Sequence, residues 1–237
     1  TFYPDIGGPP TYLKQLSDVL TQQSISIDVL TFGDATADQI KKISYPVKYI
    51  TRFAPVWWRL PRYSFNLFFK VLTSKNWFVN DYGLPAYLVS LITGKKYVIK
   101  IVGDFAWEWS VRHLHYQGTI DAFQLHRPHV LSRLVHAMQK TYVQHAQRVI
   151  VPSDYLKRIL MGWSIDGTKI HVIHNAPQIP VADTHQTIQL EQIAANEVVL
   201  CTVARLVPWK GIDHVLEVLG KFSHLQFRYL IVGIGPD

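Results

Sequence analysis

Two cations flank a short turn near the end of the 237-residue chain. Arg205 and Lys210 stand in "VARLVPWKGIDHVLEVL", residues 203–219, between an apolar strand and a predicted helix. A guanidinium and an ammonium at this place could bind one anion beside a helix N-terminus, whose dipole adds to their charge. The spacing fits two solvated charges on a surface loop equally well, so it leaves both interpretations open.

A glycine pair precedes the first predicted helix. Gly7 and Gly8 stand in "PDIGGPP". Because glycine has no Cβ, the backbone there can approach a ligand closely, and the amides that begin the helix could bind an anion. Most glycine pairs before helices are ordinary turns, and this pair alone is weak support for a site.

Two carboxylates follow the predicted strand "KYVIKIVGD". Asp104 and Glu108 stand in "VGDFAWEW". In parallel sheets ligands bind at the carboxyl ends of the strands, where a carboxylate can orient a hydroxyl or accept a proton. The alternative is structural, with Asp104 as a helix N-cap and Glu108 as a solvated side chain.

Histidine is abundant but does not form a recognisable metal motif. The chain has 11 histidines, and some lie close together, as do His113 and His115. No cysteine or carboxylate at ligand spacing accompanies them, so we expect no metal site. Ser153 has no visible His-Asp partners, which favours a helix cap over a nucleophile.

Composition predicts a soluble globular protein. Hydrophobic residues make up 48% of the chain and charged residues 17%, and no run of about twenty apolar residues could span a bilayer. The single cysteine, Cys201, excludes an intrachain disulfide. With no visible signal peptide, this favours a reducing, cytoplasmic location.

Positive charge is concentrated in one segment. The net charge is +7, and residues 39–80 contain no acidic residue. Aromatic runs such as "VWW" and "FNLFF" alternate there with Lys41, Lys42, Lys48, Arg52, Arg59, Arg62, Lys70 and Lys75. This pattern predicts a surface for phosphates or an anionic membrane, with aromatic packing on a sheet as the alternative. No helix-turn-helix or RNP-like pattern accompanies it, so we expect no nucleic-acid partner.

The order of predicted elements indicates an α/β fold in two parts. Strands and helices alternate through residues 1–176, which predicts a parallel sheet, and the helical pattern of 119–146 is expected to break near Pro128. Residues 177–196 have mixed polarity and no period, so we predict a linker there. Residues 197–237 begin a second strand-helix-strand unit, which cannot bury both faces of its sheet alone.

Together these segments resemble glycosyltransferase family 4, the group 1 glycosyltransferases of GT-B fold. The resemblance is carried by "FYPDIGGPPTYLKQLSDVL", "VIVPSDYLKRILMGWSIDGTKIHVIHNAP", "VARLVPWKGIDHVLEVLGKF" and "YLIVGIGPD", in the family's order and spacing. It implies a Rossmann-like acceptor-side domain over 1–176 and the beginning of a Rossmann-like donor-side domain over 197–237.

The resemblance also implies an activity and its residues. Members transfer a sugar from a nucleotide-diphosphate donor with retention of configuration, usually without a metal or other cofactor. Arg205 and Lys210 would bind the departing diphosphate, together with Gly7 and Gly8. Preorganised cations aimed at a leaving group's growing charge often supply the largest part of such catalysis. Other residues at matching places are Asp104 as a catalytic residue, with Glu108, Gly233 and Gly235 as contacts of donor or acceptor.

The chain departs from the family pattern in two respects. The histidine that many members place after the strand preceding "GDFAWEW" is absent, and so is the late pair of glutamates that contact the donor. No apolar strand precedes the glycine loop. We therefore expect the polypeptide to be truncated at both ends, lacking its first strand, and to be inactive or nearly so by itself.

Two function classes follow. The first is a cytoplasmic enzyme of cell-envelope polysaccharide synthesis that takes a UDP-, GDP- or ADP-sugar and a glycan or lipid-linked acceptor, with residues 39–80 at the inner face of the membrane. The second is a non-catalytic interaction module of GT-B fold. A nucleotide-sugar epimerase of related fold is less favoured, because "RLVPWKG" has the transferase form of the cationic motif.

Overall fold

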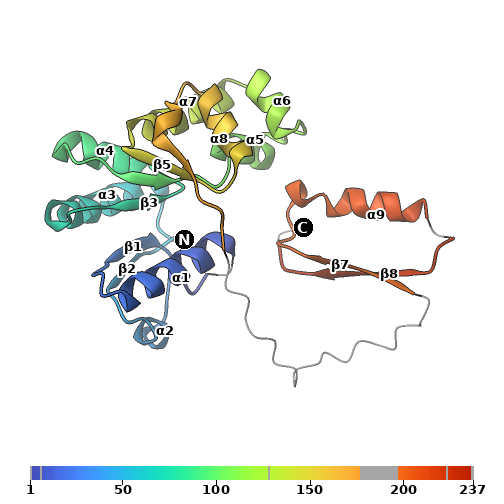
Figure 1. Cartoon of the computed structure of the whole chain (residues 1–237), viewed down its shortest axis with the longest axis horizontal. Helices are drawn as coiled ribbons and strands as arrows, with labels where there is room; N and C mark the ends of the chain where they lie inside the picture. The colour runs from blue at the N-terminus through green and yellow to red at the C-terminus, as the bar shows by residue number, and fades with distance from the viewer. Residues whose placement is uncertain (1, 6, 128, 177–196, 223, 236–237) are drawn as a thin grey trace. The chain divides into compact units, whose positions relative to one another are not determined.

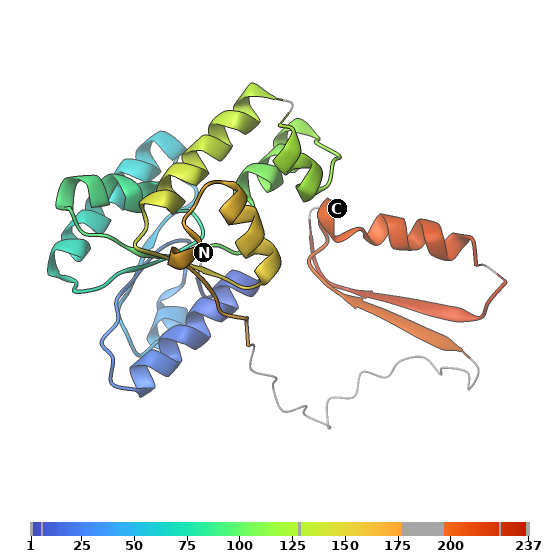
Figure 2. The same cartoon turned by 45° about the horizontal axis from the view of Figure 1, so that its top comes forward.

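The computed structural model describes residues 2–5, 7–127, 129–176, 197–222 and 224–235. The chain forms two compact units, Thr1–Pro177 (unit 1) and Gln178–Asp237 (unit 2), and each is treated separately below. Figures 1 and 2 show the helices and strands of both units. The predicted linker, residues 177–196, lies outside the described residues.

Unit 1 is built on parallel strands. They are β1 (Val29–Phe32), β2 (Val47–Ile50), β3 (Phe78–Asn80), β4 (Val98–Lys100), β5 (Arg148–Val151) and β6 (Ile170–Val172). Strands β1 and β2 form one parallel pair, and the other four form a parallel sheet in the order β3-β4-β5-β6. Parallel neighbours require long crossovers, and helices supply them here. The predicted α/β fold with a Rossmann-like parallel sheet is confirmed.

The first helix of unit 1 precedes β1, and the others lie between successive strands. They are α1 (Gly8–Gln22), α2 (Ala37–Lys41), α3 (Val56–Thr73), α4 (Leu84–Thr93), α5 (Phe105–Leu114), α6 (Ile120–Leu125), α7 (Val130–His145), α8 (Asp154–Gly162) and the 3₁₀ turn η1 (Gly167–Lys169). The stretch 119–146, which the sequence left open as one helix or two, forms the two helices α6 and α7. Ser153 is the N-cap of α8, and its hydroxyl accepts from the Leu156 amide at 3.2 Å.

One helical boundary and two further helices differ from the sequence prediction. Helix α3 begins at Val56 and contains Pro61, whereas the sequence predicts a start after that proline. A proline inside a helix removes one backbone hydrogen bond. One helical turn apart within α3, the Arg62 guanidinium lies 4.6 Å from the Trp58 ring centroid. Helices α2 and α5 were not predicted, although each has a side-chain N-cap.

The core of unit 1 lies between the four-stranded sheet and helices α4, α7 and α8. Inward-facing strand residues such as Ile99 and Val149 are fully buried there, and Tyr142 and Leu160 pack against them from the helices. Burying one side chain of this size contributes about 1.5–3 kcal/mol. This core holds β3 to β6 in register, so the carboxyl ends of these strands lie along one edge.

Unit 2 is a strand-helix-strand unit. It consists of β7 (Val198–Val203), the 3₁₀ turn η2 (Pro208–Lys210), α9 (Ile212–Gly220) and β8 (Phe227–Val232), and the two strands pair in parallel. Among its described residues Val207 is the only buried apolar side chain, and Cys201 is exposed. This agrees with the expectation that such a unit cannot bury both faces of its sheet.

Candidate functional site

The glycine loop is held at the N-terminus of α1. Gly7 is the N-cap, with φ of 146°, a conformation that side-chain-bearing residues rarely adopt. The next helical positions after Gly8 are Pro9 and Pro10, which have no N–H. The first turn therefore offers fewer amides to an anion than the sequence interpretation assumed, with Gly8 the only residue of these three that carries one.

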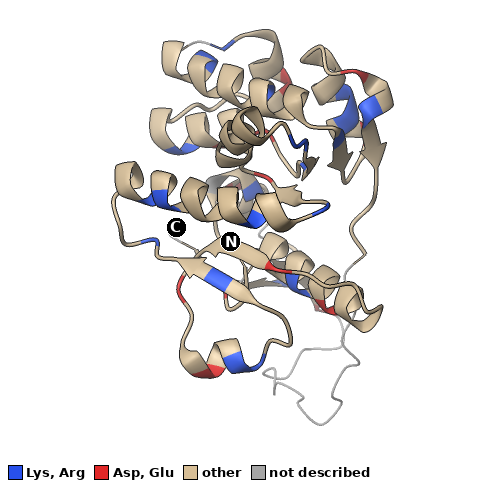
Figure 3. Ribbon diagram, turned by 90° about the vertical axis from the view of Figure 1, so that its left-hand side faces the viewer, with Lys and Arg blue, Asp and Glu red and all other residues tan. Residues whose placement is uncertain are grey.

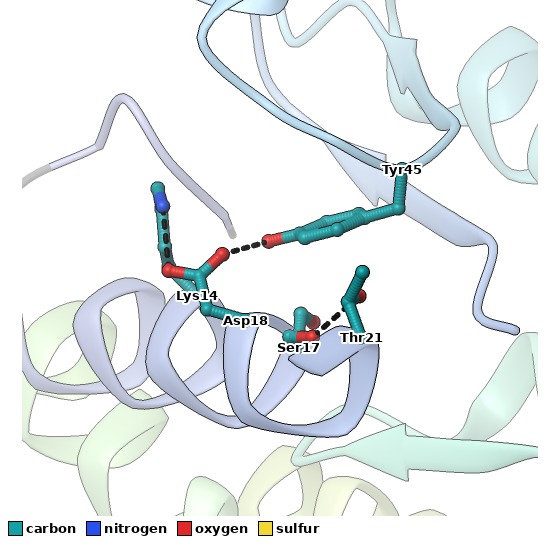
Figure 4. Close-up of polar contacts among 5 residues, drawn as sticks. All are labelled: Lys14, Ser17, Asp18, Thr21 and Tyr45. Atoms are coloured by element: carbon teal, nitrogen blue, oxygen red, sulfur yellow. Dashed lines mark hydrogen bonds and ion pairs between the residues drawn. The ribbon is translucent and has the colours of Figure 1, made fainter. Parts of the chain in front are cut away.

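Helix α1 is fixed to the segment before β2 through its polar side (Figure 4). The Asp18 carboxylate accepts from the Lys14 ammonium at 2.7 Å and from the Tyr45 hydroxyl at 3.1 Å. Tyr45 is only 8% exposed, and burial, together with the Asp18 charge, holds the pKa of its phenol well above the usual value. These contacts orient the helix that presents Gly7 and Gly8.

A cavity of about 360 Å³ opens beside this loop. Its walls come from the start of α1, the ends of β3 and β4, and the segment after β6. The lining residues are Gly7, Gly8, Pro9, Thr11, Tyr12, Gln15, Asn80, Lys100, Val102, Asn175 and Ala176. Of the predicted site residues of unit 1, Gly7 and Gly8 line it, whereas Asp104 and Glu108 do not.

Lys100 is the charged residue of this cavity. Its side chain is completely buried, its ammonium donates to Asn175 Oδ1 at 2.6 Å, and the Nζ atom lies 3.3 Å from the Tyr12 ring centroid. Burial lowers the pKa of Lys100 from its usual value. Sequence reasoning missed this residue because it considered only the carboxylates that follow the strand. A lysine at the carboxyl end of a predicted strand was the available signal.

Two polar residues end the neighbouring strand β3. Asn80 lines the cavity, and its Oδ1 atom is buried without a hydrogen-bond partner. Asp81 follows with φ of 69°, and its amide donates to the Lys100 carbonyl at 2.8 Å. Burial raises the pKa of Asp81 to about 6. A carboxyl group perturbed in this way is typical of functional sites, and the sequence interpretation did not include it.

Asp104 lies at the N-cap of α5. It is fully buried; Oδ1 accepts from the Trp107 amide at 3.1 Å, and Oδ2 accepts from Gln124 Nε2 at 2.8 Å. Burial raises its pKa, and these hydrogen bonds act in the opposite direction. The geometry is that of the structural alternative, a helix cap, and the catalytic role of Asp104 stays a prediction.

Glu108 lies one turn into α5, partly buried. A Cβ atom added at Gly103 would lie 2.6 Å from Glu108 Oε1, so the carboxylate covers that glycine at the end of β4. A side chain at Gly103 would therefore require the flexible end of Glu108 to move aside. A contact between Glu108 and a substrate stays a prediction.

Arg205 and Lys210 lie in one exposed loop of unit 2. Arg205 follows β7, and Lys210 ends η2, directly before the Gly211 N-cap of α9. Between them the buried Val207 anchors the loop, and its carbonyl accepts from the Lys210 amide at 2.9 Å. Both cations thus extend to solvent from an anchored turn at a helix N-terminus.

Gly233 and Gly235 support the same loop. A Cβ atom at Gly233 would lie 1.8 Å from the Ala204 carbonyl oxygen, and one at Gly235 would lie 1.7 Å from that of Leu206. Only glycine permits this approach of the two backbones on either side of Arg205. Ligand contacts of Gly233 and Gly235 stay predictions.

A second cavity, of about 660 Å³, lies between α6, α7 and α8. Arg127, Lys140, Arg158 and His136 contribute to its lining. Burial, assisted by the charges of Arg127 and Lys140, lowers the pKa of His136 to about 4. No residue singled out by the sequence belongs to this cavity.

No group of three or more His, Cys, Asp or Glu side chains suited to a metal ion occurs in the described part of the chain. Within the same residues, no helix combines the length and apolarity needed to cross a bilayer.

The chain was compared with known families and structures. Residues 6–176 match the sequence profile of Glycosyltransferase Family 4. Comparison with curated proteins gave no significant match. Similar folds occur in several solved structures, beginning with HepE of Anabaena bound to UDP and glucose, which has a TM-score of 0.61 and 16% identity over 99% of this chain and 60% of HepE.

Two further structures extend the comparison. The lipopolysaccharide outer core galactosyltransferase WaaB has a TM-score of 0.57 and 16% identity over 100% of this chain and 60% of WaaB. A UDP-N-acetylglucosamine 2-epimerase described for Listeria monocytogenes has a TM-score of 0.53 and 14% identity over 95% of this chain and 60% of its own. The chain thus spans about 60% of the length of these proteins. Identities this low establish the GT-B type of fold alone.

The profile match covers most of the chain and includes the glycine loop, the cavity beside it and all six strands of unit 1. The chain belongs to glycosyltransferase family 4.

Proposed function

We propose that this chain is part of a retaining glycosyltransferase that transfers a sugar from a nucleotide-diphosphate donor to a glycan or lipid-linked acceptor in the cytoplasm. The observation that carries the proposal is the family match over residues 6–176. It is supported by a ligand-sized cavity at the place where open parallel sheets bind ligands, with Gly7 and Gly8 in its wall.

In this proposal Arg205 and Lys210 bind the donor diphosphate and stabilise its charge as the sugar leaves. Their exposure in an anchored loop before α9 supports the role, because cations there add to the positive end of the helix dipole. Two donor-side cations would supply the charge stabilisation that a metal supplies elsewhere, so we propose a metal-independent reaction. UDP is the first donor nucleotide to test, since HepE was solved with UDP.

The donor test measures the melting temperature of the 237-residue chain with UDP, GDP or ADP. A ligand that binds only the native state stabilises it by about 2.7 kcal/mol at a hundred times its Kd. We expect one nucleotide to raise the melting temperature, and Arg205→Ala or Lys210→Ala to remove that rise. Lys221→Ala, at a 69% exposed lysine of unit 2, is the matched control. No rise with any nucleotide would contradict the proposed donor site.

Turnover is a separate question. The chain spans about 60% of the length of HepE, and we propose that by itself it does not complete the transfer. Release of free UDP or sugar from UDP-glucose, above the rate without protein, would contradict this. The non-catalytic module remains the alternative, and no specific observation favours the epimerase over the transferase.

A membrane-facing surface is a further part of the proposal. Along α3 the exposed side chains Trp57, Phe65, Phe69 and Leu72 recur at helical spacing. Figure 3 marks the positions of Lys and Arg along the ribbon in blue. Not all eight cations of residues 39–80 are available to lipids, since Arg52 pairs with Asp5 and Lys70 pairs with Asp28. Arg62, within α3, and Lys75, two residues after its end, are exposed.

Co-sedimentation tests this surface. We expect the chain to bind vesicles containing phosphatidylglycerol more strongly than vesicles of phosphatidylcholine, because basic residues near an anionic surface each contribute about 1 kcal/mol. Phe65→Ser should weaken binding, whereas Leu134→Ser, at a 59% exposed leucine of α7, should not. Equal binding to both vesicle types would refute a role for the inner membrane face.

A further inference from the structure

Lys100 is an unusual cation for the interior of a sheet. Its side chain has no exposed surface, and both of its near neighbours are uncharged, namely the amide of Asn175 and the ring of Tyr12. In the described part of the chain no carboxylate pairs with its ammonium. A buried charge without a countercharge costs several kcal/mol, so a structural lysine would be expected to have an acidic partner.

The surroundings of Lys100 favour an anion as the missing partner. Lys100 lines the 360 Å³ cavity, and α1, a helix of 15 residues, begins in the wall of the same cavity with no acidic residue in its first turn. The helix places a partial positive charge there. Because Pro9 and Pro10 have no N–H, the helix offers few hydrogen-bond donors of its own. The Lys100 ammonium is the donor that can balance a full negative charge.

A second group in the cavity points to a hydroxyl beside that anion. Asn80 Oδ1 is buried and has no hydrogen-bond partner. An unsatisfied buried acceptor costs about 1–3 kcal/mol, and a ligand hydroxyl would remove that cost. Asn80 and Lys100 come from the carboxyl ends of the adjacent strands β3 and β4. An anionic group and a hydroxyl on one small ligand would therefore satisfy both residues.

We propose that Lys100 and Asn80 form a sugar-phosphate subsite within unit 1, with Lys100 binding the phosphate and Asn80 accepting from a sugar hydroxyl. This subsite rests on the proposed function for its biological ligand, which is either the sugar-phosphate portion of the donor or a phosphate-bearing acceptor. Asn175 is the positioning residue that orients the Lys100 ammonium.

The test uses glucose 1-phosphate as the probe and calorimetric titration of the 237-residue chain. We expect binding that Lys100→Met weakens by at least tenfold, whereas Lys221→Met leaves it unchanged. Lys100→Arg keeps the charge and should retain binding to within about threefold. Asn80→Ala should weaken glucose 1-phosphate but not inorganic phosphate, which has no sugar hydroxyl. Circular dichroism identifies any variant that fails to fold. If Lys100→Met does not fold, Lys100→Arg still tests the proposal.

Absence of glucose 1-phosphate binding, or binding that is equal in the wild type and Lys100→Met, would overturn the subsite. Competition identifies the source of the ligand: displacement by UDP assigns the subsite to the donor, and simultaneous binding assigns it to an acceptor phosphate. Both results support the subsite. If the probe depends on Lys100 but no nucleotide binds, the proposed function fails and the subsite stands. If nucleotide binding depends on Arg205 but glucose 1-phosphate binding does not depend on Lys100, the subsite fails and the proposed function stands.

Discussion

Replacing Asp81 with asparagine should stabilise the protein in a pH-dependent way. Burial at the end of β3 raises the pKa of this carboxyl to about 6, from 3.8 for an ordinary aspartate. The folded state therefore holds the proton more tightly than the unfolded state. Well below pH 3.8 both states are protonated and the shift has no effect on stability. As the pH rises from 3.8 to about 6 the unfolded state ionises first, and stability falls.

The magnitude follows from the two pKa values. One pKa unit corresponds to about 1.36 kcal/mol, so ionisation of Asp81 costs the folded state about 3 kcal/mol above pH 7. An asparagine is never ionised and avoids this cost. It also tolerates the left-handed backbone conformation at this position, where φ is 69°. We expect Asp81→Asn to raise the unfolding free energy by about 3 kcal/mol at neutral pH, which corresponds to a melting temperature about 6–12 °C higher.

Urea unfolding followed by tryptophan fluorescence measures this effect. The signal reports mainly unit 1, because Trp209 is the only tryptophan outside it. The variant and the wild type should have similar midpoints at about pH 3 and separate as the pH rises to about 8. Asp38→Asn, at an 88% exposed carboxylate, is the control. A midpoint difference that is the same at both pH values, or no difference at neutral pH, would refute the reasoning.

Three other predictions follow from single contacts. Tyr45→Phe removes the hydrogen bond to Asp18 and should lower the unfolding free energy by about 1 kcal/mol in urea titrations; an unchanged midpoint would show that this bond does not hold α1. Asp104→Ala removes the α5 cap and the acceptor for Gln124, and it should lower the unfolding free energy by about 2–3 kcal/mol in the same titration. A decrease below about 0.5 kcal/mol would contradict the capping role. The pKa of His136 is lowered to about 4, so its imidazole should stay neutral in an NMR titration until the pH approaches that value, and titration near 6.5 would show that the ring is not buried as described.

Several elements carried signals that sequence reasoning could have used. Thr36 and Gln39 form a reciprocal capping box at α2, a pattern visible in "TADQ". Asp104 caps α5 in the way that the structural alternative for "VGDFAWEW" described. The start of α3 was harder to predict from the sequence, because a proline such as Pro61 ordinarily disfavours a helix that continues through it. Local propensity decides such cases only where tertiary contacts are weak.

The candidate site was only partly predictable. Gly7 and Gly8 were identified from their position before a helix, and they do line the cavity. Lys100 was not identified, because a lysine at the end of a strand gives no local sign of whether its ammonium is solvated or buried. That depends on α1 and the segment after β6, which are far from β4 in the sequence and supply Tyr12 and Asn175.

The sequence by itself determined the alternation of strands and helices and the family, because periodicity, turn residues and motif spacing are properties of contiguous segments. Only the tertiary structure decided which polar groups are deprived of water. The unsatisfied oxygen of Asn80 and the burial of Lys100 arise where the ends of β3 and β4 meet the start of α1, and the altered pKa of Asp81 arises from burial directly after β3. Desolvation depends on neighbours that are distant in the chain, and no pattern within one segment records it.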